Sequence, residues 1–166
     1  MPTNLLKIYN QLLELYALSE RDNHTSLRRV FDRDIANNAS FKFRGIQIFP
    51  TTADGEDKMD RLFRHLVTVI TDEKTRKREF ESDRSVRLHW IKPHVDEKAN
   101  GKTIVFSVEH ENRTYILDKD ERYVIILEPL RDKSAFFLLT AYHLLPANYK
   151  LLMNKFEKRG KPGLLI

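Results

Sequence analysis

Two arginines three residues apart are the first candidates for chemistry in this sequence. Arg84 and Arg87 lie in the stretch RSVRLHWIKP, and on a helix that spacing places them on one face. Ile91 follows Arg87 by four residues, so this face borders the apolar side of the helix. Guanidinium groups there can bind phosphate in paired hydrogen bonds while their stems pack. The alternative is a structural role in ion pairs with the neighbouring acids Glu81, Asp83 or Asp96.

Hydroxyl and ammonium groups cluster near the C-terminal end of the chain. Thr140 and Tyr142 are two apart in the apolar run SAFFLLTAY, so on a strand they share a face. Lys155 and Lys158 come late in the helix that follows, where cations favour the helix dipole. Lys150 lies in the first turn of that helix, where a cation has no such structural reason. The pattern predicts a phosphate-binding site beside a strand, against the alternative of a solvated helix.

Histidine is the side chain that titrates most readily near neutral pH, which makes His89 and His143 candidates for proton transfer or substrate contact. His89 and His94 flank Pro93, but no carboxylate recurs beside them at the spacing of metal ligands. No common catalytic or phosphate-loop signature occurs. We therefore expect neither a metal nor a cofactor. Trp90 has two readings, a core side chain or a platform for base stacking, and the core is the more usual.

Composition narrows the class of protein. The 166 residues carry a formal net charge of +5 and include no cysteine. A basic balance favours an anionic partner such as nucleic acid. No stretch approaches the ~18 apolar residues of a membrane span, and the N-terminus lacks the pattern of a signal peptide. These features predict a cytoplasmic protein without a membrane partner.

The elements that must position these residues follow from periodicity. Apolar residues at helical spacing predict helices over residues 3–20, 59–70 and 147–158. Thr25 and Ser26 are candidate caps of a further short helix. The alternation in residues 41–49 predicts a strand bent at Gly45.

Four β-rich runs separated by short polar turns predict an antiparallel meander, because parallel crossovers need a dozen or more residues. The runs cover residues 103–108, 113–117, 122–127 and 134–142. The expected fold is α+β, with N-terminal helices, a mainly antiparallel four- to five-stranded sheet and a C-terminal helix. We divide the chain into a helical region with one strand, residues 1–75, and a sheet region, residues 76–166.

Several blocks taken together resemble a known group of proteins. RSVRLHWIKP, RTYILDKDERYVIIL, FFLLTAY and NYKLLMNKFEKR follow one another between about residues 80 and 160. In order and spacing they resemble small proteins of phages and mobile elements in the barnase–EndoU–colicin–RelE-like class of nucleases. Residues 1–75 have no counterpart in that group.

The resemblance implies an endoribonuclease that needs no metal, acting as a toxin or a phage-encoded effector. In that chemistry the ribose 2′-hydroxyl attacks phosphorus, with a base, an acid and cations assisting. The implied partners are RNA and a cognate inhibitor or antitoxin. Catalytic candidates are Arg84, Arg87, Thr140, Tyr142 and Lys150, and substrate-binding candidates are Lys92, His89, His143, Lys155 and Lys158.

Two alternatives of other classes remain open. The chain could be a non-catalytic nucleic-acid-binding or regulatory protein of a mobile element, with only a basic face. It could also be a protein–protein adaptor that binds through an N-terminal stripe containing Leu5, Leu12 and Tyr16. An enzyme requires Arg87, Thr140 and Lys150 to converge in one cleft, whereas exposure of the N-terminal stripe would favour the adaptor.

Overall fold

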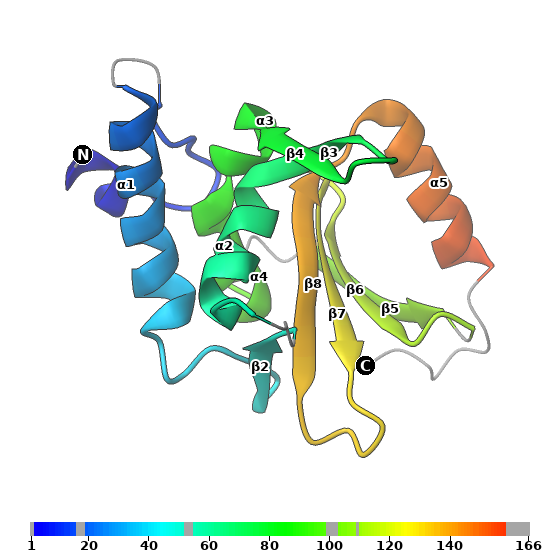
Figure 1. Cartoon of the computed structure of the whole chain (residues 1–166). Coiled ribbons are helices and arrows are strands. Elements are labelled where there is room, and N and C mark those ends of the chain that lie inside the picture. Colours follow the sequence, from blue (N-terminus) through cyan, green and yellow to red (C-terminus); the bar gives the residue numbers. More distant parts are fainter. Residues whose placement is uncertain (1, 16–18, 52–54, 99–102, 109, 159–166) are drawn as a thin grey trace.

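The computed structural model of the chain describes residues 2–15, 19–51, 55–98, 103–108 and 110–158. A six-stranded sheet has helices on both faces, and a two-stranded ribbon stands beside it (Figure 1). The expected α+β class is confirmed. The helical elements are η1 (Pro2–Leu6), α1 (Glu20–Phe31), the π-helical turn η2 (Asp32–Ala36), α2 (Lys58–Val67), α3 (Ser82–Ser85), η3 (Leu88–Trp90), α4 (Ile91–Val95) and α5 (Pro146–Glu157). The strands are β1 (Lys42–Phe43), β2 (Ile46–Pro50), β3 (Thr68–Asp72), β4 (Lys77–Phe80), β5 (Thr103–Val108), β6 (Arg113–Asp118), β7 (Tyr123–Pro129) and β8 (Phe136–His143).

The predicted antiparallel meander is confirmed. β5 pairs with β6, β6 with β7 and β7 with β8, each in antiparallel register. The sequence did not predict the neighbour on the other side of β8. There β2 runs parallel to β8, with Ile48 opposite Phe136. The order β1-β2-β8-β7-β6-β5 thus gives six strands, where four or five were expected, and includes a parallel pair.

A tight turn converts the predicted strand over residues 41–49 into a hairpin. Arg44 and Gly45 both adopt positive φ, 51° and 81°, as a type I′ turn requires. The chain therefore reverses instead of bending, and β2 returns antiparallel to β1. The reversal changes which residues face inward. Ile48 is 2% exposed, whereas Phe49, placed on the apolar face by simple alternation, is 47% exposed.

The N-terminal helix predicted over residues 3–20 is wrong for the described part of that range. Among the described residues before α1, only η1 is helical, and tertiary hydrogen bonds take the place of helical ones after η1. The buried Asn4 side chain donates to the Glu14 carbonyl and accepts from the Glu14 amide. The Leu13 amide donates to the Val86 carbonyl at 2.9 Å. The apolar residues thus reach the core from an irregular segment whose backbone is satisfied by its neighbours.

The next helix begins earlier than Thr25 and Ser26 would allow. The Ser19 hydroxyl accepts a hydrogen bond from the Asp22 amide at 3.2 Å, and α1 starts at Glu20. A serine at the N-cap satisfies one of the free amides of the first turn.

The most charged stretch forms a ribbon and a series of short helices. β3 and β4 pair antiparallel on either side of a turn at residues 73–76. Arg84 lies in α3, whereas Arg87 lies beyond it, so the two do not share one regular helix. Pro93, a residue type that usually ends a helix, lies inside α4.

Two hydrophobic clusters hold the sheet between helical layers. The larger joins Phe31 and Phe63 of the N-terminal helices to Ile125 on the sheet. The boundary drawn between residues 75 and 76 falls in the β3–β4 turn, and both regions contribute to this cluster. The smaller cluster lies under α5, where Leu152 is buried. Leu151, the neighbouring apolar residue, is 62% exposed. Along the described part of the chain, no helix is both long and apolar enough to cross a membrane.

A buried histidine links the N-terminal segment to the sheet. His94 is 0% exposed, and its Nδ1 lies 2.9 Å from the Trp90 carbonyl oxygen. Its Nε2 lies 3.4 Å from the Tyr9 hydroxyl, which donates to Asp118 at 2.5 Å. Burial lowers the pKa of His94 to about 4, against the opposing effects of the Trp90 carbonyl and Asp118. His94 is therefore neutral at pH 7, and Nδ1 carries the proton that bonds Trp90.

We expect acid to destabilise the protein through His94. In the unfolded chain its pKa returns to 6.5, so between pH 6.5 and about 4 the unfolded state binds more protons. The free energy of unfolding then falls as the pH falls through this window, by about 1.4 kcal/mol per pH unit from this residue. Urea denaturation at a series of pH values measures the slope.

The His94→Asn variant supplies the contrast. Its slope across the same window should be shallower than that of the wild type, whatever its stability at pH 7. The exposed His110 provides a matched control, and His110→Asn should keep the wild-type slope. Equal slopes for His94→Asn and wild type would contradict the assignment.

Candidate active site

A groove of about 650 Å³ lies on the α5 face of the sheet. Its walls come from α3, the end of β8 and α5, which are far apart in sequence. Part of its lining is apolar, namely Val69, Ile126, Leu145, Leu151 and Leu152. Four of the residues singled out from the sequence also line it, namely Arg84, Tyr142, His143 and Lys155. The fold thus brings together side chains of the kinds that phosphoryl chemistry uses.

Asp83 connects the histidine of the groove to an arginine. His143 Nδ1 lies 3.0 Å from Asp83 Oδ2, and Arg87 Nη1 donates to Asp83 Oδ1 at 2.6 Å. Burial raises the pKa of Asp83, but the hydrogen bonds from His143 and Arg87 outweigh it, and the pKa lies below its usual value. Asp83 is therefore ionised at neutral pH and favours the tautomer with the proton on Nδ1. His143 Nε2, which no described residue hydrogen-bonds, is left as a proton acceptor.

Arg87 thus follows the ion-pair alternative that the sequence left open. It also donates to the Asp83 carbonyl, at 2.7 Å, and its guanidinium carbon lies 5.3 Å from the centre of the Trp90 ring. Trp90 is 2% exposed, which confirms its place in the core. Arg87 therefore positions Asp83 from behind the groove.

Arg84 is a fixed cation in the groove wall. Its Nη1 donates to the carbonyls of His65 and Thr68 at 3.0 and 3.1 Å. Its guanidinium carbon lies 5.5 Å from the centre of the Tyr142 ring, a cation–π distance. Burial lowers the pKa of Arg84, but a guanidinium remains charged at any neutral pH. The groove therefore contains a partly desolvated positive charge of fixed orientation.

Lys155 reaches the groove from α5 as part of a second cluster. Its Nζ lies 2.8 Å from a Glu111 carboxylate oxygen and 3.5 Å from the Tyr115 hydroxyl, which itself donates to Glu111 at 2.5 Å. The hydrogen bond with Glu111 raises the pKa of Lys155, so the amine stays protonated. Nothing in the sequence singled out Glu111, which lies in the turn before β6.

Other predicted residues lie elsewhere. Lys150 and Lys158 are exposed on α5 and do not line the groove. Lys92 pairs with Asp96. His89 is 3% exposed, with Nε2 at 3.0 Å from the Ile8 carbonyl oxygen. Thr140 lines a separate, neighbouring hollow. Convergence of Arg87, Thr140 and Lys150 in one cleft, expected for an enzyme, is therefore not observed.

The N-terminal stripe that the adaptor alternative would use is partly exposed and partly packed against the core. Leu12 is 47% exposed, whereas Leu5 packs against the larger core cluster. Tyr16 lies outside the described residues. The exposed apolar residues of this segment are Leu6, Ile8 and Leu12.

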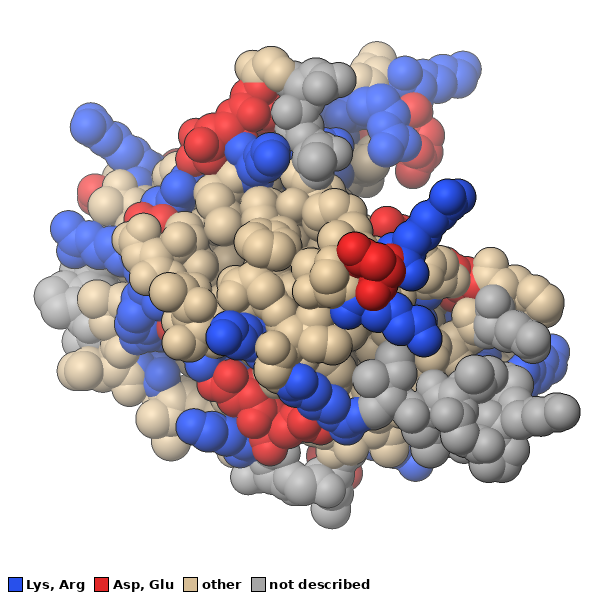
Figure 2. All heavy atoms as spheres, turned by 90° about the horizontal axis from the view of Figure 1, so that it is seen from below, with Lys and Arg blue, Asp and Glu red and all other residues tan. Residues whose placement is uncertain are grey.

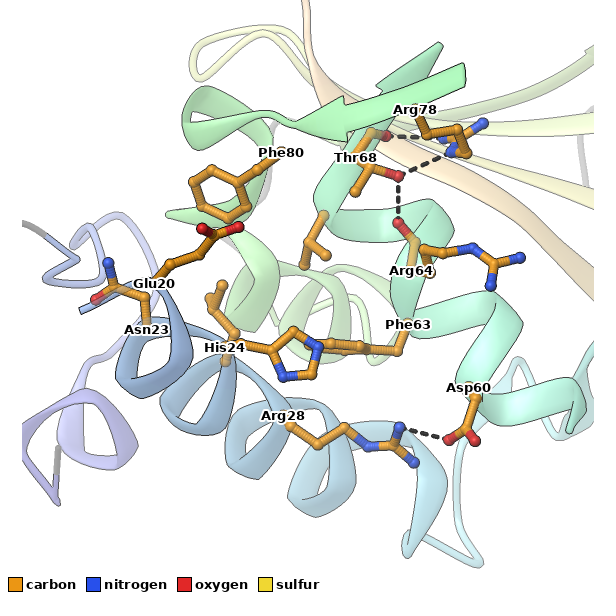
Figure 3. A pocket seen from close by; sticks show the side chains of 12 residues that line it. Glu20, Asn23, His24, Arg28, Asp60, Phe63, Arg64, Thr68, Arg78 and Phe80 are labelled. Carbon is orange, nitrogen blue, oxygen red and sulfur yellow. Dashed lines mark hydrogen bonds and ion pairs between the residues drawn. The ribbon is translucent and has the colours of Figure 1, made fainter. Parts of the chain in front are cut away.

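A larger pocket, about 830 Å³, lies between α1, α2 and the β3–β4 ribbon (Figure 3). Its arginines are engaged within the protein. Arg28 pairs with Asp60 at 2.6 Å, and Arg78 donates to the Thr68 hydroxyl at 2.8 Å. The His24 ring packs edge-on against Phe63 and has no hydrogen bond to any described residue. The pocket therefore lacks the oriented acid–base pair that the groove contains.

Charge does not gather into one basic face at the end of the molecule drawn in Figure 2. Among the side chains described there, basic and acidic residues are interspersed around an uncharged centre. The groove is similarly mixed, with Glu81 and Asp83 near Arg84. On the face drawn in Figure 2 and in the groove, a site for RNA must therefore rest on a few local cations.

Comparisons with protein-family models, with curated proteins and with solved structures found no match. The resemblance to the nuclease class therefore stays a prediction. Function has to be argued from the chemistry of the groove.

We expect the Asp83 carboxylate to stabilise the fold as well as the site. Arg87 is only 13% exposed, so Asp83→Asn leaves a desolvated guanidinium without its counter-charge. The free energy of unfolding should fall by about 1–3 kcal/mol, the range for hydrogen bonds to charged groups. Chemical denaturation at pH 7 measures it.

The pair of Arg76 with Glu73 is the matched control, because both side chains are well exposed, at 68% and 81%. Glu73→Gln should cost less than about 0.5 kcal/mol. Equal losses in the two variants would mean that Asp83 holds Arg87 no more firmly than a surface acid does.

Proposed function

We propose that this chain is an endoribonuclease that cleaves RNA without a metal ion. One observation supports this above the others: His143, oriented by Asp83, lies in the same groove as the cations Arg84 and Lys155. A surface that only binds RNA has no use for an imidazole held in one tautomer by a carboxylate. Proton transfer does have such a use, because the base must present a lone pair in a fixed direction.

The proposed reaction forms one bond to phosphorus and breaks another. His143 Nε2 takes the proton of the ribose 2′-hydroxyl, and the 2′-oxygen attacks the adjacent phosphorus. The bond from phosphorus to the 5′-oxygen of the next nucleotide breaks. The Tyr142 hydroxyl, beside Arg84 in the groove wall, donates a proton to that leaving oxygen. The products are a 2′,3′-cyclic phosphate and a 5′-hydroxyl.

The remaining residues act on charge and position. Arg84 and Lys155 stabilise the negative charge that develops on the phosphoryl oxygens. Both are held before substrate arrives, Arg84 by two carbonyls and Lys155 by Glu111, so little reorganisation accompanies the reaction. Arg87 acts through Asp83 as a positioning residue. Apolar residues of the groove, among them Leu145 and Leu151, offer surface to unstacked bases.

Single-stranded RNA is the substrate class that suits this arrangement, because an exposed base and a flexible backbone can enter a narrow groove. The toxin or phage-effector role belongs to the same proposal. A cell that makes such an enzyme must restrain it, which is the reason to expect a cognate inhibitor.

We expect the purified chain to cut single-stranded RNA in EDTA and to leave 2′,3′-cyclic phosphate ends. His143→Asn should lower the rate by about 10²–10⁴-fold, the usual contribution of a general base. Replacing the attacked nucleotide by its 2′-deoxy form should abolish cleavage. Gel electrophoresis and mass spectrometry of the fragments measure both effects.

Two pairs of variants control this experiment. His110→Asn changes an exposed histidine outside the groove and should cut at the wild-type rate. On α5, Lys155→Ala should be impaired, whereas Lys158→Ala should not. If the wild type binds RNA with steeply salt-dependent affinity but never cuts it, the enzyme proposal fails and the nucleic-acid-binding alternative replaces it.

A further inference from the structure

A smaller hollow of about 370 Å³ adjoins the groove along β8. Arg61 and His65 reach it from α2, Arg113 from β6 and Thr140 from β8. Thr140 and Tyr142 are two residues apart on the same face of the strand. The hollow and the groove are therefore separated by about 7 Å along β8. Arg84 also links them, since it bonds the His65 carbonyl and contacts the Tyr142 ring.

The hollow differs from the groove in its charge. Its described lining contains two arginines and no aspartate or glutamate, whereas the groove lining contains the two acids Glu81 and Asp83 beside its cations. No described residue pairs with the Arg113 guanidinium. Arg61 has Glu56 as an ion-pair partner at 3.9 Å. The hollow therefore offers an anion the positive charge of Arg113, with Arg61 beside it.

His65 adds hydrogen-bonding capacity without titrating near neutral pH. Burial lowers its pKa to about 4, and the nearby Arg78, Arg84 and Arg61 act in the same direction. The ring is therefore neutral at pH 7 and retains one N–H donor. A neutral donor among permanent cations suits an anion that stays charged at every physiological pH.

Thr140 carries an unsatisfied polar atom in the wall of the hollow. Its Oγ1 is buried without a hydrogen-bond partner. A lone buried hydroxyl is unfavourable, and rotation about χ1 in the presence of an anion would give it an acceptor. The isosteric change Thr140→Val separates the two roles. It should stabilise the free protein, because the unsatisfied hydroxyl is gone, and weaken anion binding.

We propose that this hollow binds a backbone phosphate of the RNA, one nucleotide away from the linkage that is cut. The proposal rests on the endoribonuclease function, which it deepens by making the substrate at least a trinucleotide. Two phosphates bound in the groove and in the hollow fix the register of the strand over His143. Arg113 supplies the main charge, with Arg61, His65 and Thr140 completing the site.

The test uses fluorescein-labelled tetranucleotides of 2′-O-methyl RNA, which cannot be cleaved. Each of the three linkages is replaced in turn by an uncharged methylphosphonate, and affinity is measured by fluorescence anisotropy. In the wild type, two replacements should weaken binding, and one of them reports the hollow. The replacement at the hollow should lower the affinity of the wild type about tenfold. It should not lower the affinity of Arg113→Ala further, because that variant lacks the guanidinium that binds the phosphate charge.

Arg131→Ala is the matched control, because Arg131 is exposed on the β7–β8 turn away from both sites. For each replaced linkage, Arg131→Ala should lose affinity by the same factor as the wild type. Thr140→Val should reduce the response at the same linkage as Arg113→Ala. If Arg113→Ala keeps the full response at all three linkages, the hollow is not a phosphate subsite.

A third arm distinguishes an RNA phosphate from free phosphate. Inorganic phosphate is added to wild type and Arg113→Ala, and the shift in melting temperature is recorded. An Arg113-dependent shift with no preference among the linkages would mean a free-phosphate site and would overturn the RNA assignment.

Failure of the subsite and failure of the enzyme proposal give different results. Cleavage of unmodified RNA without an Arg113-dependent linkage removes the subsite and leaves the enzyme. An Arg113-dependent linkage without any cleavage leaves a phosphate-binding site and removes the enzyme.

Discussion

The placement of the Trp90 ring is the constraint on which the candidate site depends. Trp90 is 2% exposed, and its ring lies between the N-terminal segment and β7. The centre of the ring is 5.1 Å from that of the Tyr9 ring and 5.4 Å from that of the Tyr123 ring. Its Nε1 donates to the Gln11 carbonyl at 2.9 Å. The segments around it, α3, η3 and α4, are each too short to be stable as isolated helices. Packing around Trp90 holds them, and with them the residues that α3 presents to the groove.

Arg87 connects this core to the groove. Its stem and guanidinium lie against Trp90, its carbonyl accepts from the Tyr123 hydroxyl at 3.4 Å, and its Nη1 holds Asp83. Asp83 in turn orients His143. A desolvated charge is costly unless it is paired, so Arg87 and Asp83 each fix the other. The same ion pair thus serves stability and orients the imidazole. The fold needs the ion pair of Arg87 and Asp83 for its stability, so orienting His143 requires no additional contact.

The parts of this structure that could be predicted are those set by local pattern. Four runs of strand-forming residues with short turns gave the meander, and the acids near Arg84 and Arg87, Asp83 among them, made an ion pair one of two possibilities. The N-terminal segment could not be predicted, because its apolar spacing fits a helix equally well, and the hydrogen bonds that decide against one come from distant residues such as Val86 and Trp90. The parallel pairing of β2 with β8 could not be predicted either, because no local pattern specifies a partner strand so far away in the sequence.

A bulge in β8 decides which residues the strand offers to the groove. Phe136 and Leu138 face the larger core cluster, and strict alternation would send Thr140 and Tyr142 into the same core. The pairing with β7 instead shifts at this point, so that Leu138 lies opposite Leu127 and Thr140 opposite Ile126.

Leu139 is therefore the extra residue, and the strand changes faces around it. Ala141 takes the core position, Tyr142 packs against the cluster under α5, and Thr140 lies opposite Ile126, a member of that cluster. A one-residue slip moves every later side chain to the other face of a sheet. Without the bulge, Thr140 and Tyr142 would point into the larger core cluster instead. The run FFLLTAY shows nothing of this, because a bulge is set by pairing with the neighbouring strand and not by the residues that form it.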